Sequence, residues 1–258
     1  MTIEEQRACM APLQMAGTLI MENGGETYRV EETVTRIGRA FGLAEVESFA
    51  VPSGLFISYR MADGSVETAV KRVHRGDVNL TRVNRVNSIS RRVEREGMTP
   101  AQTLAELEEV AGSGLRAALL PLGAGICAAG FTWMFEGNAE AFLISFLVSA
   151  LVYLGMRLSE RAGMDAMGSV VLGSFVTVLA PRLLGLAIAG LQTEAIIGGA
   201  LMPMLPGLTM TTAVQDLMRG DMISGLSHGA KALLTAALVA GGALAANALF
   251  GLIAGGKI

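Results

Sequence analysis

The chain has 258 residues, of which 52% are hydrophobic and 17% charged, and its mean hydropathy is +0.50. This composition excludes a disordered chain, while glycines without a period and only two cysteines exclude collagen and a disulfide scaffold. The net charge of −3 gives no electrostatic reason to expect nucleic-acid binding.

Charged residues are concentrated in the first part of the chain. Residues 1–114 carry 13 Lys+Arg and 16 Asp+Glu, whereas the longer stretch 115–258 carries 7 of each. The contrast predicts two domains: a cytoplasmic α+β domain over 1–114 and an all-α polytopic membrane bundle over 115–258. The N-terminus lacks a basic start followed by an apolar run, so no secretory signal is expected and the first domain should stay in the cytoplasm.

Periodicity and turn signals predict the elements of the first domain. Asn23-Gly24-Gly25 and Gly42 are typical helix ends, and Asp63-Gly64 between apolar runs is typical of a β-hairpin. The expected elements in chain order are helices over 4–22 and 27–41, strands over 46–51, 55–60 and 66–73, and helices over 80–96 and 99–110.

The most reactive-looking stretch in this domain is His74-Arg75-Gly76-Asp77, followed by Asn79. One interpretation makes His74 a general base oriented by Asp77. The other, which we favour, is a polar turn in which Asp77 or Asn79 caps the next helix, because no Ser or Cys nucleophile sits in a recognisable motif. Cys9 and Cys127 lie far apart and form neither a redox pair nor a metal-ligand spacing, so neither a metal nor another cofactor is expected.

The second domain contains apolar runs long enough to cross a bilayer, which needs about 20 residues per helix. Inner loops would carry Arg157, Arg161, Arg219 and Lys231, which places the N-terminus in the cytoplasm and, after an odd number of spans, the C-terminus outside. The five expected spans cover about 115–135, 139–156, 166–190, 195–217 and 224–254.

The fourth span contains helix-breaking residues in the middle of an apolar run. Pro203, Pro206 and Gly207 interrupt it, and irregular backbone at membrane depth is tolerated only within protein or beside an aqueous cavity. Beyond the break, Thr209, Thr212 and Asp216 share one helical face at i, i+3 and i+7. We interpret the break and this face as a substrate-binding element. The alternative is a packing kink with Asp216 at the cytoplasmic interface.

An arginine inside an apolar span is costly to bury in a membrane and therefore suggests a functional role. Arg182 follows Pro181 in the third span and could attract a carboxylate or pair with an acid on a partner chain. Its position near the outer end also permits the side chain to reach the head groups, and the sequence leaves this choice open.

Several short motifs, in order, resemble those of a known family. They are Asn23-Gly24-Gly25-Glu26-Thr27, Arg39-Ala40-Phe41-Gly42-Leu43, His74-Arg75-Gly76-Asp77-Val78-Asn79, Leu205-Pro206-Gly207, Asp216-Leu217-Met218-Arg219-Gly220 and Ser224-Gly225-Leu226. Over nearly its whole length the chain resembles the N-terminal half of the threonine/serine exporter family (ThrE), particularly its short, YjjP-like members.

The resemblance implies a multi-pass inner-membrane exporter subunit, not an enzyme, for threonine/serine-type amino acids or a dicarboxylate such as succinate. It also implies a separate YjjB-like membrane subunit as partner, and a homo-oligomer is left open. The residues expected to contact substrate are Asp216, Thr209, Thr211, Thr212, Arg182, Pro206 and Gly207. The alternatives are a membrane-anchored hydrolase acting through His74 and Asp77, and a sensory or scaffolding protein.

Overall fold

The computed structural model describes residues 2–74, 76, 78–113 and 119–255. The chain divides into two compact units, which are taken separately below. Unit 1 comprises residues 1–114 together with 211–229, and unit 2 comprises 115–210 together with 230–258. The segment 211–229, which the sequence analysis placed in the membrane bundle, is therefore grouped with the N-terminal residues.

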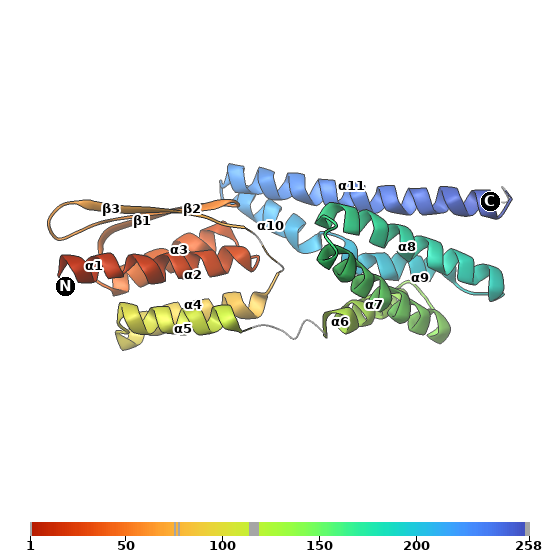
Figure 1. Ribbon diagram of the computed structural model, residues 1–258, viewed down its shortest axis with the longest axis horizontal. Coiled ribbons are helices and arrows are strands. Elements are labelled where there is room, and N and C mark those ends of the chain that lie inside the picture. Colours follow the sequence, from red (N-terminus) through yellow and green to blue (C-terminus); the bar gives the residue numbers. More distant parts are fainter. Residues whose placement is uncertain (1, 75, 77, 114–118, 256–258) are drawn as a thin grey trace. The chain divides into compact units, whose positions relative to one another are not determined.

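Unit 1 contains helices and one antiparallel sheet of three strands in the order β1-β2-β3. Its N-terminal elements are α1 (Ile3–Ala8), α2 (Met10–Glu22), α3 (Thr27–Ala40), β1 (Ala44–Val51), β2 (Gly54–Arg60), β3 (Val66–Arg72), α4 (Leu80–Glu96) and α5 (Pro100–Gly112). In this unit the sheet covers the layer of α1, α2 and α3, and α4 and α5 lie against the opposite side of that layer (Figure 1).

The first helix departs from expectation. The sequence predicts one helix over 4–22, but the structure has two, interrupted at Cys9. Pro12 explains the break, because it has no backbone N–H to donate to the carbonyl of Ala8. Burial, with a smaller contribution from the charge of Glu5, raises the pKa of the Cys9 thiol to about 11, so this thiol is protonated and unreactive at neutral pH.

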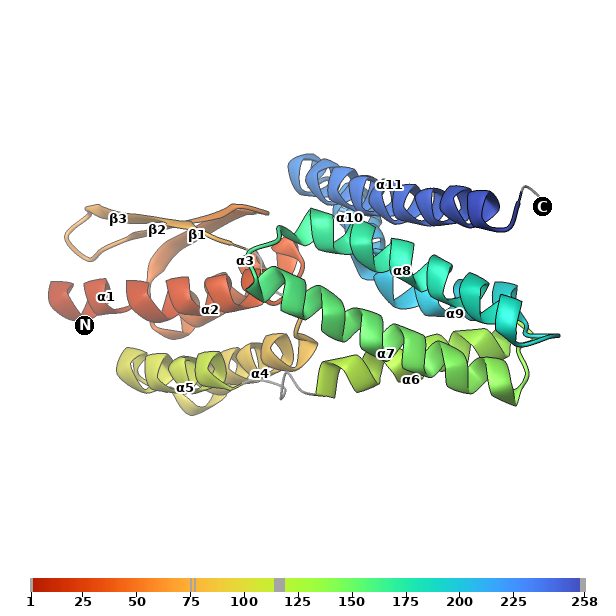
Figure 2. The same ribbon diagram turned by 45° about the vertical axis from the view of Figure 1, so that its right-hand side comes forward.

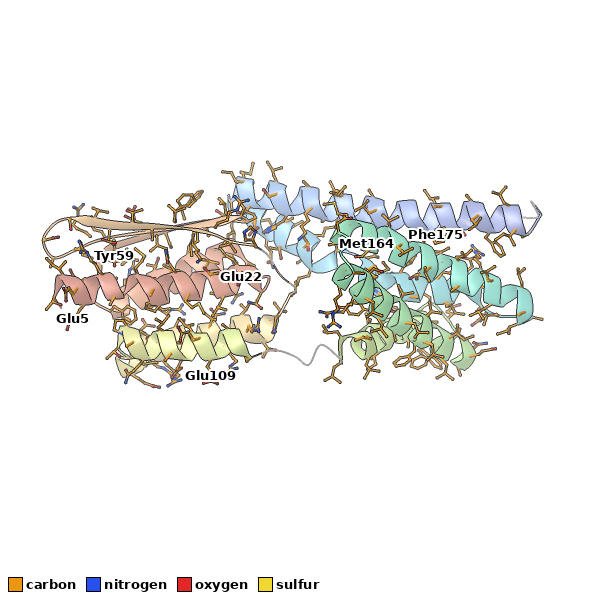
Figure 3. All side chains as sticks on the ribbon, viewed as in Figure 1. Glu5, Glu22, Tyr59, Glu109, Met164 and Phe175 are labelled. Atoms are coloured by element: carbon orange, nitrogen blue, oxygen red, sulfur yellow. The ribbon has the colours of Figure 1, made fainter. Side chains whose placement is uncertain are left out.

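Alternation along the strands gives the sheet one buried and one open face. In β2, Leu55, Ile57 and Tyr59 are buried and join the side chains of α2 and α3 in one hydrophobic core. Tyr59 lies between the sheet and the helices beneath it (Figure 3). Its hydroxyl donates to the carbonyl of Gln6 at 2.7 Å, which satisfies the polar end of this buried ring. On the other face, Phe56 pairs in register with Phe49 and is 42% exposed.

Unit 2 is made of apolar helices, seen side by side in Figure 2. They are α6 (Leu120–Met134), α7 (Ala139–Arg161), α8 (Ala166–Ala187), α9 (Thr193–Leu201) and the 3-10 turn η2 (Met202–Met204). Two further helices, α10 (Gly207–Met218) and α11 (Met222–Ile253), have residues in both units.

Three of the described helices, α7, α8 and α11, are long and apolar enough to cross a membrane. Counting the bent pair formed by Thr193–Met204 and Gly207–Met218 as one broken span raises the number to four. α6 has only 15 residues, and the first residues of its expected span, 115–118, lie outside the described part. The count of five spans therefore stays a prediction.

The expected break in the fourth apolar run is present. α9 ends in η2, which contains Pro203, and α10 begins at Gly207 after an extended residue, Leu205. The two helical pieces are bent by 51°. Proline ring geometry and the missing amide protons account for this interruption.

α11 packs against α8 through a residue that must be small. A Cβ built on Gly242 would lie against the Ser174 hydroxyl and the Val171 carbonyl, whereas one on Gly241 would have nothing within 4 Å. The close packing of α11 on α8 therefore depends on Gly242.

We expect Gly242→Ala to lower the thermal stability of the detergent-solubilised protein, because the added methyl group overlaps the backbone of α8. Gly241→Ala is the matched control. It should be neutral or stabilising by up to about 1 kcal/mol through helix propensity. Equal melting temperatures for the two variants would contradict this packing.

Candidate functional site

The candidate site lies in unit 1, where α10 and α11 form a tight helical hairpin. Gly220 in the turn has a φ of +87° and donates to the carbonyl of Leu217, and Asp221 donates to the carbonyl of Asp216 at 2.9 Å. These two bonds form a Schellman motif, which requires a residue with positive φ at this position. The turn fixes where Asp216 lies relative to the first residues of α11.

Asp216 is completely buried, and each of its two carboxylate oxygens has a side-chain partner. Oδ2 lies 2.8 Å from Nδ1 of His228, which is itself only 2% exposed. Oδ1 accepts from the hydroxyl of Thr27, the first residue of α3, at 3.3 Å. An isolated buried carboxylate would be strongly destabilising, so these partners are a condition for its burial.

Small residues allow the two helices of the hairpin to approach closely enough for this contact. A Cβ built on Gly225 would lie 2.6 Å from Cγ of Leu217, and one built on Gly229 would lie 3.9 Å from Cβ of Ala213. His228 sits between these two glycines on the same face of α11. The hairpin therefore brings the Asp216 and His228 side chains together by backbone packing.

A second layer of charges surrounds the pair. The guanidinium of Arg219 lies 3.4 Å from the centre of the Tyr28 ring, a cation–π contact between the hairpin turn and α3. Glu26 accepts from Arg29 at 2.8 Å. Burial opposes ionisation of Glu26, but the hydrogen bond from Arg29 and the charges of Arg29 and Arg219 lower its pKa. Glu26 is thus an anion beside the cationic turn.

The loop before α3 connects this cluster to the segment that follows the sheet. Asn79 donates its backbone N–H to the carbonyl of Asn23 at 3.0 Å, and Gly76 donates to Glu22 at 3.0 Å. Gly24 has a φ of +84°, and a Cβ on it would meet Val78 at 3.0 Å. Three motifs that lie far apart in the sequence thus converge around residues 23–27.

The predicted polar face of α10 points inward, as its spacing indicated. Thr212 is 4% exposed and Asp216 is fully buried, while Thr209 is partly buried on the same face. Thr211 lies on the exposed side of the helix. Pro206 and Gly207 lie at the helix start, partly buried and exposed respectively.

Arg182 belongs to unit 2, where it forms an ion pair, a hydrogen bond and a cation–π contact with residues of the same unit. It contacts Glu194 at 2.7 Å, donates to Asn247 at 3.2 Å and lies over the Phe250 ring. This network joins α8, α9 and α11. Arg182 and Asp216, both expected to contact substrate, belong to different compact units.

The prediction that Asp77 or Asn79 caps the helix after residues 74–79 is confirmed for Asn79. The side chain of Asn79 accepts from the backbone N–H of Arg82 at 3.1 Å and caps α4. His74 is exposed. Asp77 lies outside the described residues.

Sequence reasoning missed His228 as a site residue and did not assign a role to Thr27. The available signal was the scarcity of histidine: the chain has two, and His228 lies between Gly225 and Gly229 at helical spacing in an apolar run. Thr27 carries no such signal, because it approaches Asp216 only through tertiary folding across 189 residues. Within the described ranges, no group of three or more His, Cys, Asp or Glu residues could hold a metal ion.

Long apolar helices, a broken apolar helix pair and a buried carboxylate–imidazole pair are features that membrane transporters combine. The chain belongs to the threonine/serine exporter family: the ThrE model, described as "Putative threonine/serine exporter", matches residues 13–250. This membership identifies a multi-pass inner-membrane transport protein and not an enzyme.

Two curated proteins are similar to the chain along nearly its whole length. Both are described as "Probable succinate transporter subunit YjjP". The protein from Escherichia coli (strain K12) is 23% identical over 253 residues, which cover 98% of each chain. The protein from Klebsiella aerogenes is 23% identical over 249 residues, or 96% of each chain. No solved structure matches the chain.

A double-mutant cycle tests the Asp216–His228 contact. Asp216→Asn, His228→Asn and the double variant should show a coupling energy in unfolding of about 1–3 kcal/mol, because each partner offsets the desolvation of the other. The measurement is unfolding of the purified protein in detergent. Arg85 and Glu109, an exposed ion pair, provide the control cycle. Coupling no larger than in the control would contradict the described pair.

Proposed function

We propose that this chain is an inner-membrane subunit of a secondary exporter of small metabolites. The substrates are threonine/serine-type amino acids or a dicarboxylate such as succinate. The similarity to proteins described as transporter subunits supports a second component, which we identify as a YjjB-like membrane subunit. The observation that carries the mechanism is the complete burial of Asp216 against His228.

In this proposal residues 1–114 form a cytoplasmic α+β domain and residues 115–258 the membrane domain with five spans. Lys and Arg placement supports this orientation, since Arg157, Arg161, Arg219 and Lys231 would all face the cytoplasm and the C-terminus would lie outside. The fourth span is the broken pair of helices around Pro206.

We assign proton coupling to Asp216 and His228. Oδ2 of Asp216 and Nδ1 of His228 lie 2.8 Å apart, so uptake of one proton between them would change the charge of a site that has no solvent exposure at Asp216. Such a change alters how strongly the hairpin is held to Thr27, and this is the step that would link proton movement to a conformational change. Because both Asp216 oxygens already have protein partners, the geometry favours a proton over a substrate ammonium at this residue.

Substrate contacts are assigned to the broken helix and to Arg182. The helix is interrupted at Pro206 and Gly207, and Thr209, Thr211 and Thr212 supply hydroxyls on the turns that follow. Arg182 already binds a carboxylate, that of Glu194, at 2.7 Å. Its guanidinium therefore has the chemistry to hold the carboxylate that either substrate class carries.

Efflux from cells preloaded with labelled threonine, serine or succinate tests the exporter function. We expect efflux when the chain is expressed with a YjjB-like subunit and little when it is expressed alone, because the relatives are described as subunits. The labelled compound that leaves identifies the substrate. Efflux from neither strain would favour a sensory or scaffolding role.

The two histidines provide a matched test of the coupling site. His228→Ala and Asp216→Asn should each reduce efflux to near background at unchanged membrane abundance, because the pair can no longer exchange a proton. His74→Ala removes an exposed histidine and should export normally. Normal efflux by Asp216→Asn would exclude this residue from the mechanism.

A further inference from the structure

Unit 2 contains an ion pair whose two members are exposed to very different degrees. Nη1 of Arg182 in α8 lies 2.7 Å from Oε1 of Glu194 in α9. The Arg182 side chain is 26% exposed, whereas that of Glu194 is 76% exposed. Because most of the Glu194 side chain is not covered by protein, it can leave the arginine without disturbing the packing of the unit.

Uncharged groups of α11 hold the Arg182 guanidinium independently of Glu194. Nε of Arg182 donates to Oδ1 of Asn247 at 3.2 Å, and Cζ lies 5.9 Å from the centre of the Phe250 ring. These two contacts orient the guanidinium without neutralising its charge. Glu194 contacts a different nitrogen, Nη1, so its departure would leave a positioned cation behind.

The position of Glu194 in its own helix stabilises the carboxylate even without the arginine. Glu194 lies in the first turn of α9, where the helix dipole favours an anion. The start of this helix is also held by its neighbours, since the Gln192 side chain accepts from the backbone N–H of Asn138 at 2.6 Å. Exchange at Arg182 therefore requires rotation of the Glu194 side chain and no displacement of the helix.

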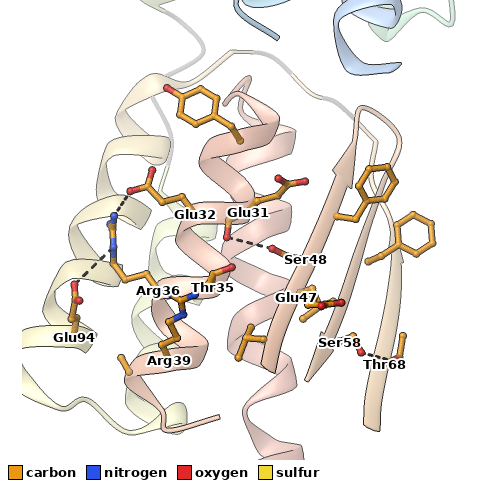
Figure 4. Close-up of a pocket in the computed structure, with 16 residues that line it drawn as sticks. Glu31, Glu32, Thr35, Arg36, Arg39, Glu47, Ser48, Ser58, Thr68 and Glu94 are labelled. Carbon is orange, nitrogen blue, oxygen red and sulfur yellow. Dashed lines mark hydrogen bonds and ion pairs between the residues drawn. The ribbon is translucent and has the colours of Figure 1, made fainter. Parts of the chain in front are cut away.

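Arg36 in unit 1 shows the contrasting case of a permanently paired arginine. Its side chain is 23% exposed, close to the value for Arg182, but it contacts two acids, Glu32 and Glu94 (Figure 4). It also donates to Ser90 at 3.4 Å. An anion would have to displace two carboxylates from Arg36, whereas Arg182 has one such partner among the described residues.

We infer that Glu194 is an internal competitor of the substrate for Arg182. The Glu194 carboxylate occupies the guanidinium in the empty site, an arriving substrate carboxylate displaces it, and its return releases the substrate. Asn247 and Phe250 are positioning residues that hold the guanidinium during the exchange. A competitor lowers the apparent affinity by the fraction of time that it occupies the site, which favours release. The inference rests on the proposed function for the carboxylate ligand and adds the means of its release.

Carboxylate binding to the full-length protein in nanodiscs tests the competition. The probes are succinate and L-threonine, each compared with its uncharged-end counterpart, succinamide and L-threoninamide. Glu194→Gln should bind at least one of the two acids roughly twofold to fivefold more tightly than the unmodified chain, the range expected for loss of an exposed ion pair. The amides should show no gain. Absence of a gain for both acids, or an equal gain for their amides, overturns the inference.

Glu140→Gln is the matched control for the loss of a negative charge. Glu140 is also an exposed acid in the first turn of an apolar helix, α7, and it has no ion-pair partner among the described residues. Its neutralisation should leave the affinity for succinate and L-threonine unchanged. A gain equal to that of Glu194→Gln would indicate a general effect of charge and overturn the assignment to Arg182.

Variants of the groups around the guanidinium test its positioning. In the Glu194→Gln background, Asn247→Ala and Phe250→Leu should each weaken carboxylate binding roughly threefold or more, and Arg182→Gln should abolish it. This background has already lost the acid, so Arg182→Gln leaves no unpaired carboxylate that could impair folding. Undiminished binding in all three variants would place the carboxylate elsewhere and overturn the inference.

Efflux measurements separate competition from a structural role of the ion pair. Glu194→Gln should lower both the maximal rate and the internal substrate concentration that gives half of it, because substrate held more tightly leaves more slowly. A structural role would lower the rate alone. The binding assay needs neither efflux nor a second subunit. A binding gain without any export therefore rejects the exporter proposal, whereas export without a binding gain rejects the competitor.

Discussion

The organisation of unit 1 depends on the burial of one carboxylate. Removing the Asp216 side chain from water is compatible with folding only if both oxygens find partners, and these come from a different helix in each case: Thr27 on α3 and His228 on α11. That requirement fixes the register between α3 and the hairpin. It also explains why Gly225 has no side chain, since a larger residue would separate the two helices that must bring Asp216 and His228 together.

Residues 23–27 act as the structural centre of this arrangement. On one side they bind the segment that follows the sheet, through Asn23 and Asn79, and on the other they supply Thr27 to Asp216. Three of the short motifs that carry the family resemblance, residues 23–27, 74–79 and 216–220, are joined by hydrogen bonds in the folded chain. Together they link α3 both to the segment after the sheet and to the α10–α11 hairpin.

Both helices of the α10–α11 hairpin have residues in each of the two units. α11 is one helix of 32 residues whose first part belongs to unit 1 and whose remainder belongs to unit 2, in which Gly242 packs against α8. α10 likewise begins at the helix break, at Gly207, and carries Asp216 near its end at Met218. In the proposed mechanism, Asp216 and His228 therefore lie on two helices that each have residues in both units.

Local physics made much of this protein predictable from its sequence. Alternation, the Asp63-Gly64 turn and glycine helix ends placed the three strands and α3, α4 and α5 within a few residues, and Pro203 with Gly207 predicted the broken apolar run. The spacing of Thr209, Thr212 and Asp216 predicted a shared inward face, because a helix repeats every 3.6 residues. The effect of Pro12 on the first helix is equally local but was overlooked.

Only the tertiary structure decided what Asp216 meets. No periodicity relates Thr27 to a residue 189 positions later, and the pairing with His228 depends on a turn and on glycine packing that act together. The same holds for Arg182, whose partner Glu194 is on a neighbouring helix of unit 2. Sequence thus determined which residues are costly to bury, since that is a property of each side chain. The fold determined which partners make the burial possible, since that depends on distances set by packing across the whole unit.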